Sequence, residues 1–221
     1  IQTGSDGDTV SIDYIRIRPA NPFGPSSEVT VSNTAGSKNK NLVKNGSFEA
    51  GGIPNPWPYY CNIPYWTKTS GGGVNDKLGP FWDNGYKMHG KQVAFCQGSQ
   101  ILSQEVFGFV SGQQYTLRFL EDLRNSSLEV DLVVRLNGTD IVNAHRVPFG
   151  EFTLVSADFM SPGNGNFLLE FEVFVSGDGT LLLDGISIVP QGEANPFPPA
   201  TLPPRPPGLI INGSFEDEPI N

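Results

Sequence analysis

The chain has 221 residues, and its 23 acidic side chains outnumber the 14 basic ones, giving a net charge of −9 at pH 7. That balance excludes the basic face that a nucleic-acid partner requires, and no stretch approaches the ~20 apolar residues that span a bilayer. Abundant glycine (26) and proline (19) indicate turn-rich β structure rather than helix. We therefore expect an extracellular or cell-surface protein that does not insert into membranes and whose acidity suits hard cations such as calcium.

A repeat organises the chain. The apolar segment 10–19 (VSIDYIRIRP) matches 181–190 (LLLDGISIVP), and NGSFE occurs at 45–49 and again at 212–216. The period is about 170 residues, the size of a whole domain rather than of a solenoid unit. We predict one complete domain with a fragment of a further module on each side. The expected boundaries are a closing strand in 1–18, a linker in 19–40, the complete domain in 41–190, a Pro-rich linker in 191–208 and an opening strand in 209–221.

The two terminal fragments must find partners, because an unpaired apolar strand is an aggregation hazard. Burying their large apolar side chains would contribute on the order of 10 kcal/mol before ordering costs. Either they belong to modules of a longer tandem array, or they complete the sheets of other copies head to tail, which builds a filament. The expected assembly residues are Val10, Ile12, Ile15, Ile17, Leu209, Ile210, Ile211 and Phe215.

The segment 51–90 places many aromatic residues among glycine and proline, with no sustained alternation. A loop of that length in a compact domain is usually functional or disordered, and the aromatic content argues against disorder. The aromatic side chains either stack on sugar rings or pack the loop onto the domain or onto a neighbouring subunit. The candidate contact residues for a glycan or a partner are Trp57, Tyr65, Trp66, Trp82 and Asp83.

Cys61 and Cys96 are the only cysteines, so one disulfide is possible. A bridge would indicate an oxidising compartment, and it would tie down a loop without regular structure. We expect this disulfide; the alternative is a pair of free buried thiols.

Alternating apolar residues predict strands through the rest of the domain. Every second residue from Leu128 to Leu136 is Leu or Val, and Asn137-Gly138 then gives the strongest short signal for a hairpin. The same alternation occurs in 115–119 and 167–175, and turn signals recur roughly every 8–12 residues. The pattern predicts about eight or nine antiparallel strands in a jelly-roll β-sandwich.

Three motifs follow one another along the predicted domain: NLVKNGSFE at 41–49, HGKQVAFCQG at 89–98 and LLLDGISIVP at 181–190. Together they resemble the galactose-binding-like β-sandwich superfamily, which includes carbohydrate-binding modules. The resemblance covers 41–190. It implies that the first and last strands are neighbours in one sheet, that a structural calcium lies where they meet, and that the module binds glycans or serves as a scaffold.

The resemblance assigns the calcium carboxylates to Glu49 and Asp184, with Glu216 and Asp13 at the matching positions of the terminal fragments. Two carboxylates from strand ends, supplemented by backbone carbonyls, suit an ion that takes six to eight oxygen ligands. Alternatively, Glu49 caps a turn and Asp184 pairs with a basic side chain.

No catalytic constellation stands out in the sequence. Glu170 and Glu172 share one face of a strand, where a glycosidase pair could lie, but the alternation favours a solvated face. His89 and His145 lack zinc-site spacing. We expect a non-catalytic extracellular structural module that contains calcium and assembles through its terminal strands into a filament or surface array. The alternative is a glycan-binding module of a larger cell-wall or polysaccharide-active protein.

Overall fold

The computed structural model describes residues 40–51, 60–76, 89–124 and 128–198, and within these ranges it contains ten β-strands and no helix. The strands are β1 (Thr67–Lys68), β2 (Gly72–Asp76), β3 (Gln92–Gln97), β4 (Gln100–Phe109), β5 (Gln114–Leu123), β6 (Val130–Leu136), β7 (Thr139–Arg146), β8 (Thr153–Met160), β9 (Gly165–Val175) and β10 (Thr180–Pro190).

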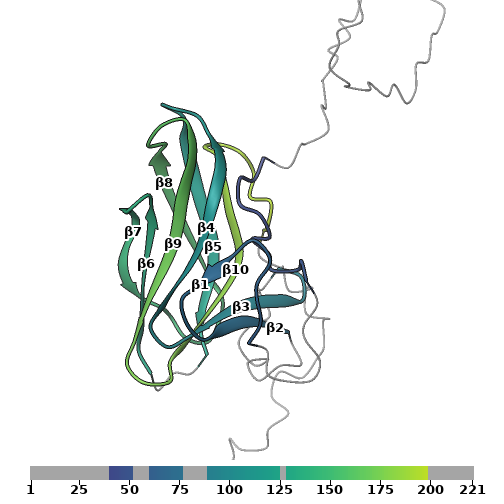
Figure 1. The fold of residues 1–221 in the computed structure, drawn as a ribbon, viewed down its shortest axis with the longest axis vertical. Coiled ribbons are helices and arrows are strands. Elements are labelled where there is room, and N and C mark those ends of the chain that lie inside the picture. The colour runs from purple at the N-terminus through teal and green to yellow at the C-terminus, as the bar shows by residue number, and fades with distance from the viewer. Residues whose placement is uncertain (1–39, 52–59, 77–88, 125–127, 199–221) are drawn as a thin grey trace, which may run out of the picture. The chain divides into compact units, whose positions relative to one another are not determined.

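The strands form two antiparallel sheets of five strands that pack face to face (Figure 1). Sheet A has the order β1-β4-β9-β6-β7, and sheet B has the order β2-β3-β10-β5-β8. The jelly-roll β-sandwich predicted from alternation is therefore confirmed. The strand count exceeds the prediction because β1 and β2 come from the segment 51–90, which shows no alternation; β2 contains Gly72-Gly73 and pairs with β3 along its whole length.

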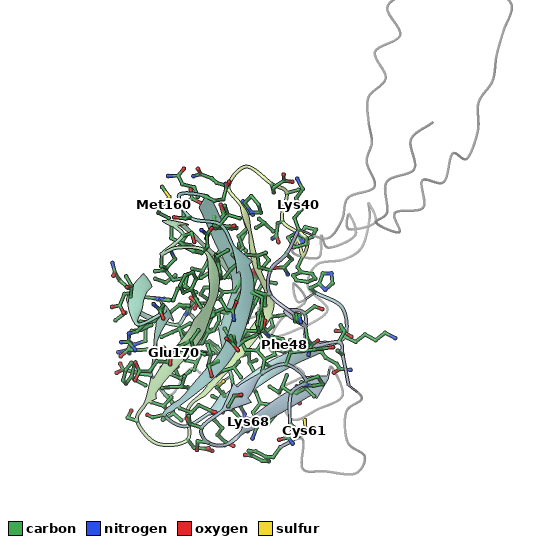
Figure 2. All side chains as sticks on the ribbon, turned by 45° about the horizontal axis from the view of Figure 1, so that its top comes forward. Lys40, Phe48, Cys61, Lys68, Met160 and Glu170 are labelled. Carbon is green, nitrogen blue, oxygen red and sulfur yellow. The ribbon has the colours of Figure 1, made fainter. Side chains whose placement is uncertain are left out.

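The core lies between the sheets and is filled by the residues that the period of two selects. In β6, Val130 and every second residue to Leu136 are at most 1% exposed. In β9, Leu169, Phe171 and Val173 are equally buried. Phe48, from the segment before β1, is also completely buried (Figure 2). The outer faces of β6 and β9 carry the polar side chains of Asp131, Arg135, Glu170 and Glu172, and also the apolar side chains of Val133, Leu168 and Phe174.

The hairpin between β6 and β7 has the predicted turn. Asn137 and Gly138 both adopt positive φ, at 50° and 77°. Both central residues of a type I′ turn require this conformation, which asparagine and glycine tolerate best.

The opening segment lies beside β10, the central strand of sheet B. The N–H of Leu42 donates to the carbonyl of Ile188 (2.9 Å), and the N–H of Ile186 donates to the carbonyl of Gly46 (2.8 Å). A Cβ on Gly46 would overlap the Ile186 carbonyl, so this close approach requires glycine. The two motifs at the ends of the domain are therefore neighbours, although residues 41–49 lie beside β10 as a turn-rich segment and not as a strand of the sheet that the resemblance implies.

Residues 191–198 continue the module beyond β10 instead of leaving it as a linker. The N–H of Gln191 donates to the carbonyl of Gln114 (2.9 Å). The ring of Phe197 packs edge-on against the ring of His89, with ring centres 4.9 Å apart. The sequence 191–198 therefore belongs to the folded module in the described structure.

The two cysteines are free thiols in the structure, so the expected disulfide is not formed. Cys96 on β3 is 1% exposed and belongs to the core between the sheets, against which Cys61 packs. Burial raises the pKa of the Cys96 thiol to about 12. Both residues serve as small apolar side chains, which is the role that buried cysteines often have.

One ionisable pair bridges the two sheets. Glu121 of β5 is 2% exposed, and both of its carboxylate oxygens lie 2.9 Å from Nε2 of His145 on β7. Nδ1 of the same ring lies 3.1 Å from the carbonyl oxygen of Asn143. Since both ring nitrogens face acceptors, either the imidazole carries two protons or the carboxyl carries one. Burial raises the pKa of the Glu121 carboxyl, and its bond to His145 offsets part of that shift.

Candidate functional site

A groove of about 320 Å³ crosses β1, β4 and β9 on the outer face of sheet A. It brings aromatic, hydroxyl and charged side chains together. The lining residues are Lys44, Tyr65, Thr67, Ser103, Gln104, Glu105, Phe107 and Leu168.

Strand register builds the polar floor of the groove. Thr67 pairs with Ser103, and Glu105 pairs with Leu168 on the neighbouring strand. Because successive residues of a strand point to opposite faces, Ser103, Glu105 and Phe107 share the outer face while Leu102 and Val106 fill the core. The groove therefore offers hydroxyls and a carboxylate next to apolar surface.

Two exposed aromatic rings stand over this floor. Tyr65 is 63% exposed and Phe107 is 47% exposed. The ammonium group of Lys44 lies 5.7 Å from the centre of the Tyr65 ring and 5.6 Å from the centre of the Phe107 ring. Both distances are within the range of cation–π attraction. The lysine thus stands between the two rings.

Gln104 fixes the two loop residues that enter the groove. Its side chain is 4% exposed and reaches two separate loops. Oε1 accepts from the N–H of Lys44 (2.8 Å), and Nε2 donates to the carbonyls of Lys44 (2.8 Å) and Tyr65 (3.2 Å). One buried amide therefore holds the main chain of both residues against β4.

Tyr65 and Trp66 have opposite roles, and the prediction that Trp66 contacts a glycan is corrected by its burial. Trp66 is 7% exposed, its Nε1 donates to the carbonyl of Asn45 (3.2 Å), and its ring packs on Phe48 and Phe171. A ring enclosed in this way has no free face for a sugar, so Trp66 instead anchors the loop, which was the alternative interpretation.

The turn around Tyr65 is what sends the two rings apart. Tyr65 adopts a φ of 72°, in the left-handed region that a non-glycine residue enters at a cost of about 1–3 kcal/mol. The N–H of Trp66 closes the turn on the carbonyl of Ile63 (3.0 Å). Strained residues of this kind cluster at functional sites.

Several predicted site residues lie outside the described residues: the contact residues Trp57, Trp82 and Asp83, the calcium carboxylates Asp13 and Glu216, and all eight assembly side chains. Phe107, by contrast, was missed by sequence reasoning. The available signal was its position on β4, where it follows Ser103 and Glu105 on the polar face, so that alternation places a large aromatic ring in water.

Glu49 and Asp184 both contact the turn at 89–92. Asp184, which is fully buried on β10, accepts from the N–H of Gly185 (2.6 Å) and from that of His89. Oε1 of Glu49 accepts from the N–H groups of Lys91 (2.7 Å) and Gln92 (2.8 Å). Burial raises the pKa of the Asp184 carboxyl well above its ordinary value, and the neighbouring negative charge of Glu49 raises it further. The two carboxylates are thus close enough to repel.

These two carboxylates fit the charge that calcium requires, but they do not complete its coordination. Among the described residues, no group of three His, Cys, Asp or Glu side chains could hold a metal. Any further oxygen ligands from this part of the chain would have to be backbone carbonyls or amide or hydroxyl oxygens.

The outer face of sheet A continues past the groove onto β6. Glu170 is paired in register with Ser103 and with Arg135. Glu172 forms an ion pair with Arg135, whose Nε also binds Asp140 at 2.7 Å. The two glutamates therefore lie on the partly solvated face that alternation predicts, with Glu172 held by a cation.

Solved structures with a similar fold include TmCBM61 in complex with β-1,4-galactotriose, which is 16% identical with a TM-score of 0.48; the match covers 68% of this chain and 99% of that one. The CBM22-1 xylan-binding domain from Paenibacillus barcinonensis Xyn10C is 19% identical with a TM-score of 0.43, and the match covers 58% of this chain and 87% of that one. The enzymatically active domain of bacteriophage CBA120 tailspike protein 4 is 15% identical with a TM-score of 0.48, covering 68% of this chain but 21% of that one.

The sequence matches no protein-family model, and no curated protein matches it. Within the described ranges, no helix has the length and apolar character needed to cross a membrane.

Proposed function

We propose that this module binds a polysaccharide in the groove over β1, β4 and β9. The observation that carries the proposal is the pair of exposed rings, Tyr65 and Phe107, standing over hydroxyl and carboxylate groups. Aromatic rings stack on the apolar faces of sugars, and a few placed polar groups fix their orientation. Because Gln104 holds two of the lining residues in place, little ordering is needed on binding.

Of the two functions expected from the sequence, this proposal takes glycan binding rather than filament assembly. The groove consists of described residues, whereas the expected assembly residues lie outside them. Binding without catalysis is the form we favour, because Glu172 on the same face is committed to Arg135. We infer further that the module works at the cell surface or outside the cell, where structural polysaccharides lie.

The test is binding to a panel of soluble polysaccharides, measured by affinity electrophoresis and calorimetry. Tyr65→Ala and Phe107→Ala should each weaken binding at least about tenfold, equivalent to about 1.4 kcal/mol. Phe149→Ala is the matched control, because Phe149 is 54% exposed outside the groove. The proposal fails if the native chain binds no polysaccharide, or if the control loses as much affinity as the groove variants.

We also propose that Glu49 and Asp184 hold a structural calcium ion. The support is a buried carboxylate beside a second carboxylate, with no ion-pair partner for either among the described residues. A divalent cation would relieve their repulsion and join the opening segment to β10. Millimolar calcium should then raise the melting temperature of the native chain, and Asp184→Asn should abolish the increase. An equal increase in that variant, or none in the native chain, would contradict the assignment.

Assembly through the terminal segments is a second candidate, which the contacts of the intact module favour. Its opening segment and β10 bond through Leu42 and Gly46, and the repeat preserves this glycine as Gly213. We propose that segment 209–216 of one copy pairs with segment 10–19 of another. The native chain should then sediment as a concentration-dependent polymer, and Gly213→Val should remain monomeric. A native chain that stays monomeric at all concentrations would refute assembly.

A further inference from the structure

We infer that the groove selects glycans that carry carboxylates, namely polymers of uronic acids, and that Lys44 is the residue that recognises the charge. The inference rests on the proposed polysaccharide binding and adds the substrate class. Its basis is a cation close to the two rings on which a sugar would stack: the ammonium group of Lys44 lies within 5.7 Å of the centres of both aromatic rings.

The ammonium group of Lys44 is available for a ligand. Among the described residues it forms no ion pair, although the exposed Lys40 pairs with Glu193. Its main chain is held at both ends by the buried Gln104, so the side chain leaves from a fixed point. A lysine between two rings gains only a weak cation–π attraction there, whereas a carboxylate would add a charge-assisted hydrogen bond.

The chemistry of uronic acids matches this arrangement. Their carboxylate is attached one bond outside the sugar ring, so a ring stacked on Tyr65 or Phe107 carries its charge beside the stack. Because the ammonium group of Lys44 lies within 5.7 Å of both ring centres, the carboxylate of such a sugar would come within its reach, and an ammonium–carboxylate contact has a length of about 2.8 Å. A neutral sugar offers only a hydroxymethyl group at the same position.

Glu105 constrains how such a ligand can lie. It also lines the groove, and its Oε1 accepts from Nδ2 of Asn166 (3.0 Å). A ligand carboxylate would be repelled by Glu105 and attracted by Lys44, whereas ligand hydroxyl groups could donate to Glu105. The two charges therefore orient an acidic sugar in one direction across the strands.

The net charge of the chain opposes the binding of an acidic polymer. With a net charge of −9, the protein repels a polyanion at long range. Salt screens that repulsion beyond roughly 8 Å at physiological ionic strength. Any preference for an acidic over a neutral form of the same polymer must therefore come from a cation at the site.

The experiment compares polygalacturonate with its fully methyl-esterified form, which has the same backbone without the charge. Calorimetry should show about fivefold to tenfold tighter binding of the acid form at 0.15 M salt. Lys44→Gln should remove this difference and Lys44→Arg should retain it. Lys40→Gln removes the same charge from a lysine outside the groove and should change neither affinity. Raising the salt concentration should weaken binding of the acid form alone.

The outcomes separate this inference from the proposed function. If both polymer forms bind equally and Lys44→Gln changes neither, or if Lys40→Gln has the same effect as Lys44→Gln, uronate selection is overturned while polysaccharide binding stands. If neither form binds and the neutral polysaccharides of the panel also fail to bind, both proposals fall.

Discussion

Replacing Gln104 by alanine tests whether one buried amide both stabilises the sandwich and shapes the groove. The substitution removes three hydrogen bonds to the main chain of Lys44 and Tyr65. A hydrogen bond of this kind contributes about 0.5–1.5 kcal/mol net, so the free energy of unfolding should fall by about 1.5–4.5 kcal/mol. In a domain of this size, each 1 kcal/mol lowers the melting temperature by about 2–4 °C.

Urea unfolding followed by tryptophan fluorescence measures this loss, since Trp66 is enclosed in the core. Gln104→Glu is a sharper version, because it keeps the acceptor for Lys44 but turns a carboxylate oxygen toward the two carbonyls. Gln104→Glu should lower the free energy of unfolding at least as much as Gln104→Ala does. Gln113→Ala is the control, since the side chain of the exposed Gln113 donates to the carbonyl of its neighbour Gln114 and not to a distant segment.

Glycan affinity should also fall in Gln104→Ala and Gln104→Glu, because the loops that carry Lys44 and Tyr65 lose their common support. If Gln104→Ala unfolds at the same urea concentration as the native chain, the bond count does not translate into stability and the reasoning is refuted. If stability falls but affinity does not, Gln104 supports the fold without shaping the groove.

Three further predictions follow from buried groups. Burial raises the pKa of the Glu121 carboxyl above its usual 4.5, so the folded state binds the carboxyl proton more tightly than the unfolded chain does. The stability that this proton contributes is therefore fully present below pH 4.5 and is lost as the pH rises through the folded pKa. Glu121→Gln should therefore lose less unfolding free energy than the native chain as the pH rises above 4.5, as followed by urea titration. Gly46→Ala should lower the free energy of unfolding by at least about 1–3 kcal/mol, because the added Cβ would overlap a carbonyl of β10. Gly163→Ala should lower it much less in the same assay, because the nearest atom to its added Cβ lies 3.7 Å away. Native-state alkylation read by mass spectrometry should label the half-buried Cys61 and spare Cys96, whose burial raises its pKa to about 12; protection of both until reduction would show that a disulfide forms after all.

The fold could be predicted from the sequence because its signals are local. A period of two selects the buried face of a strand such as β6, and Asn137-Gly138 permits only a few turn types. Each of these signals lies within a few consecutive residues, so no knowledge of the tertiary structure is needed to interpret it.

The groove could be predicted only in part, because it depends on pairing between distant segments. Lys44 gave no signal, and the position of Phe107 on the polar face of β4 did not reveal its neighbour, since only the bonds of Gln104 and the register of β4 bring the two together. Tyr65 and Trp66 are adjacent and equally suited to sugars. The left-handed turn at Tyr65 decides which of the two faces outward, and composition does not report a dihedral angle.

The bonds of Gln104 also bear on how such a module could diversify. They reach backbone atoms at positions 44 and 65, which every residue type except proline possesses, and not the side chains themselves. The residues there could be exchanged while the scaffold beneath stayed the same. Only two codons would then need to change for the recognition surface to acquire a new preference, and the sandwich would not have to be redesigned with it.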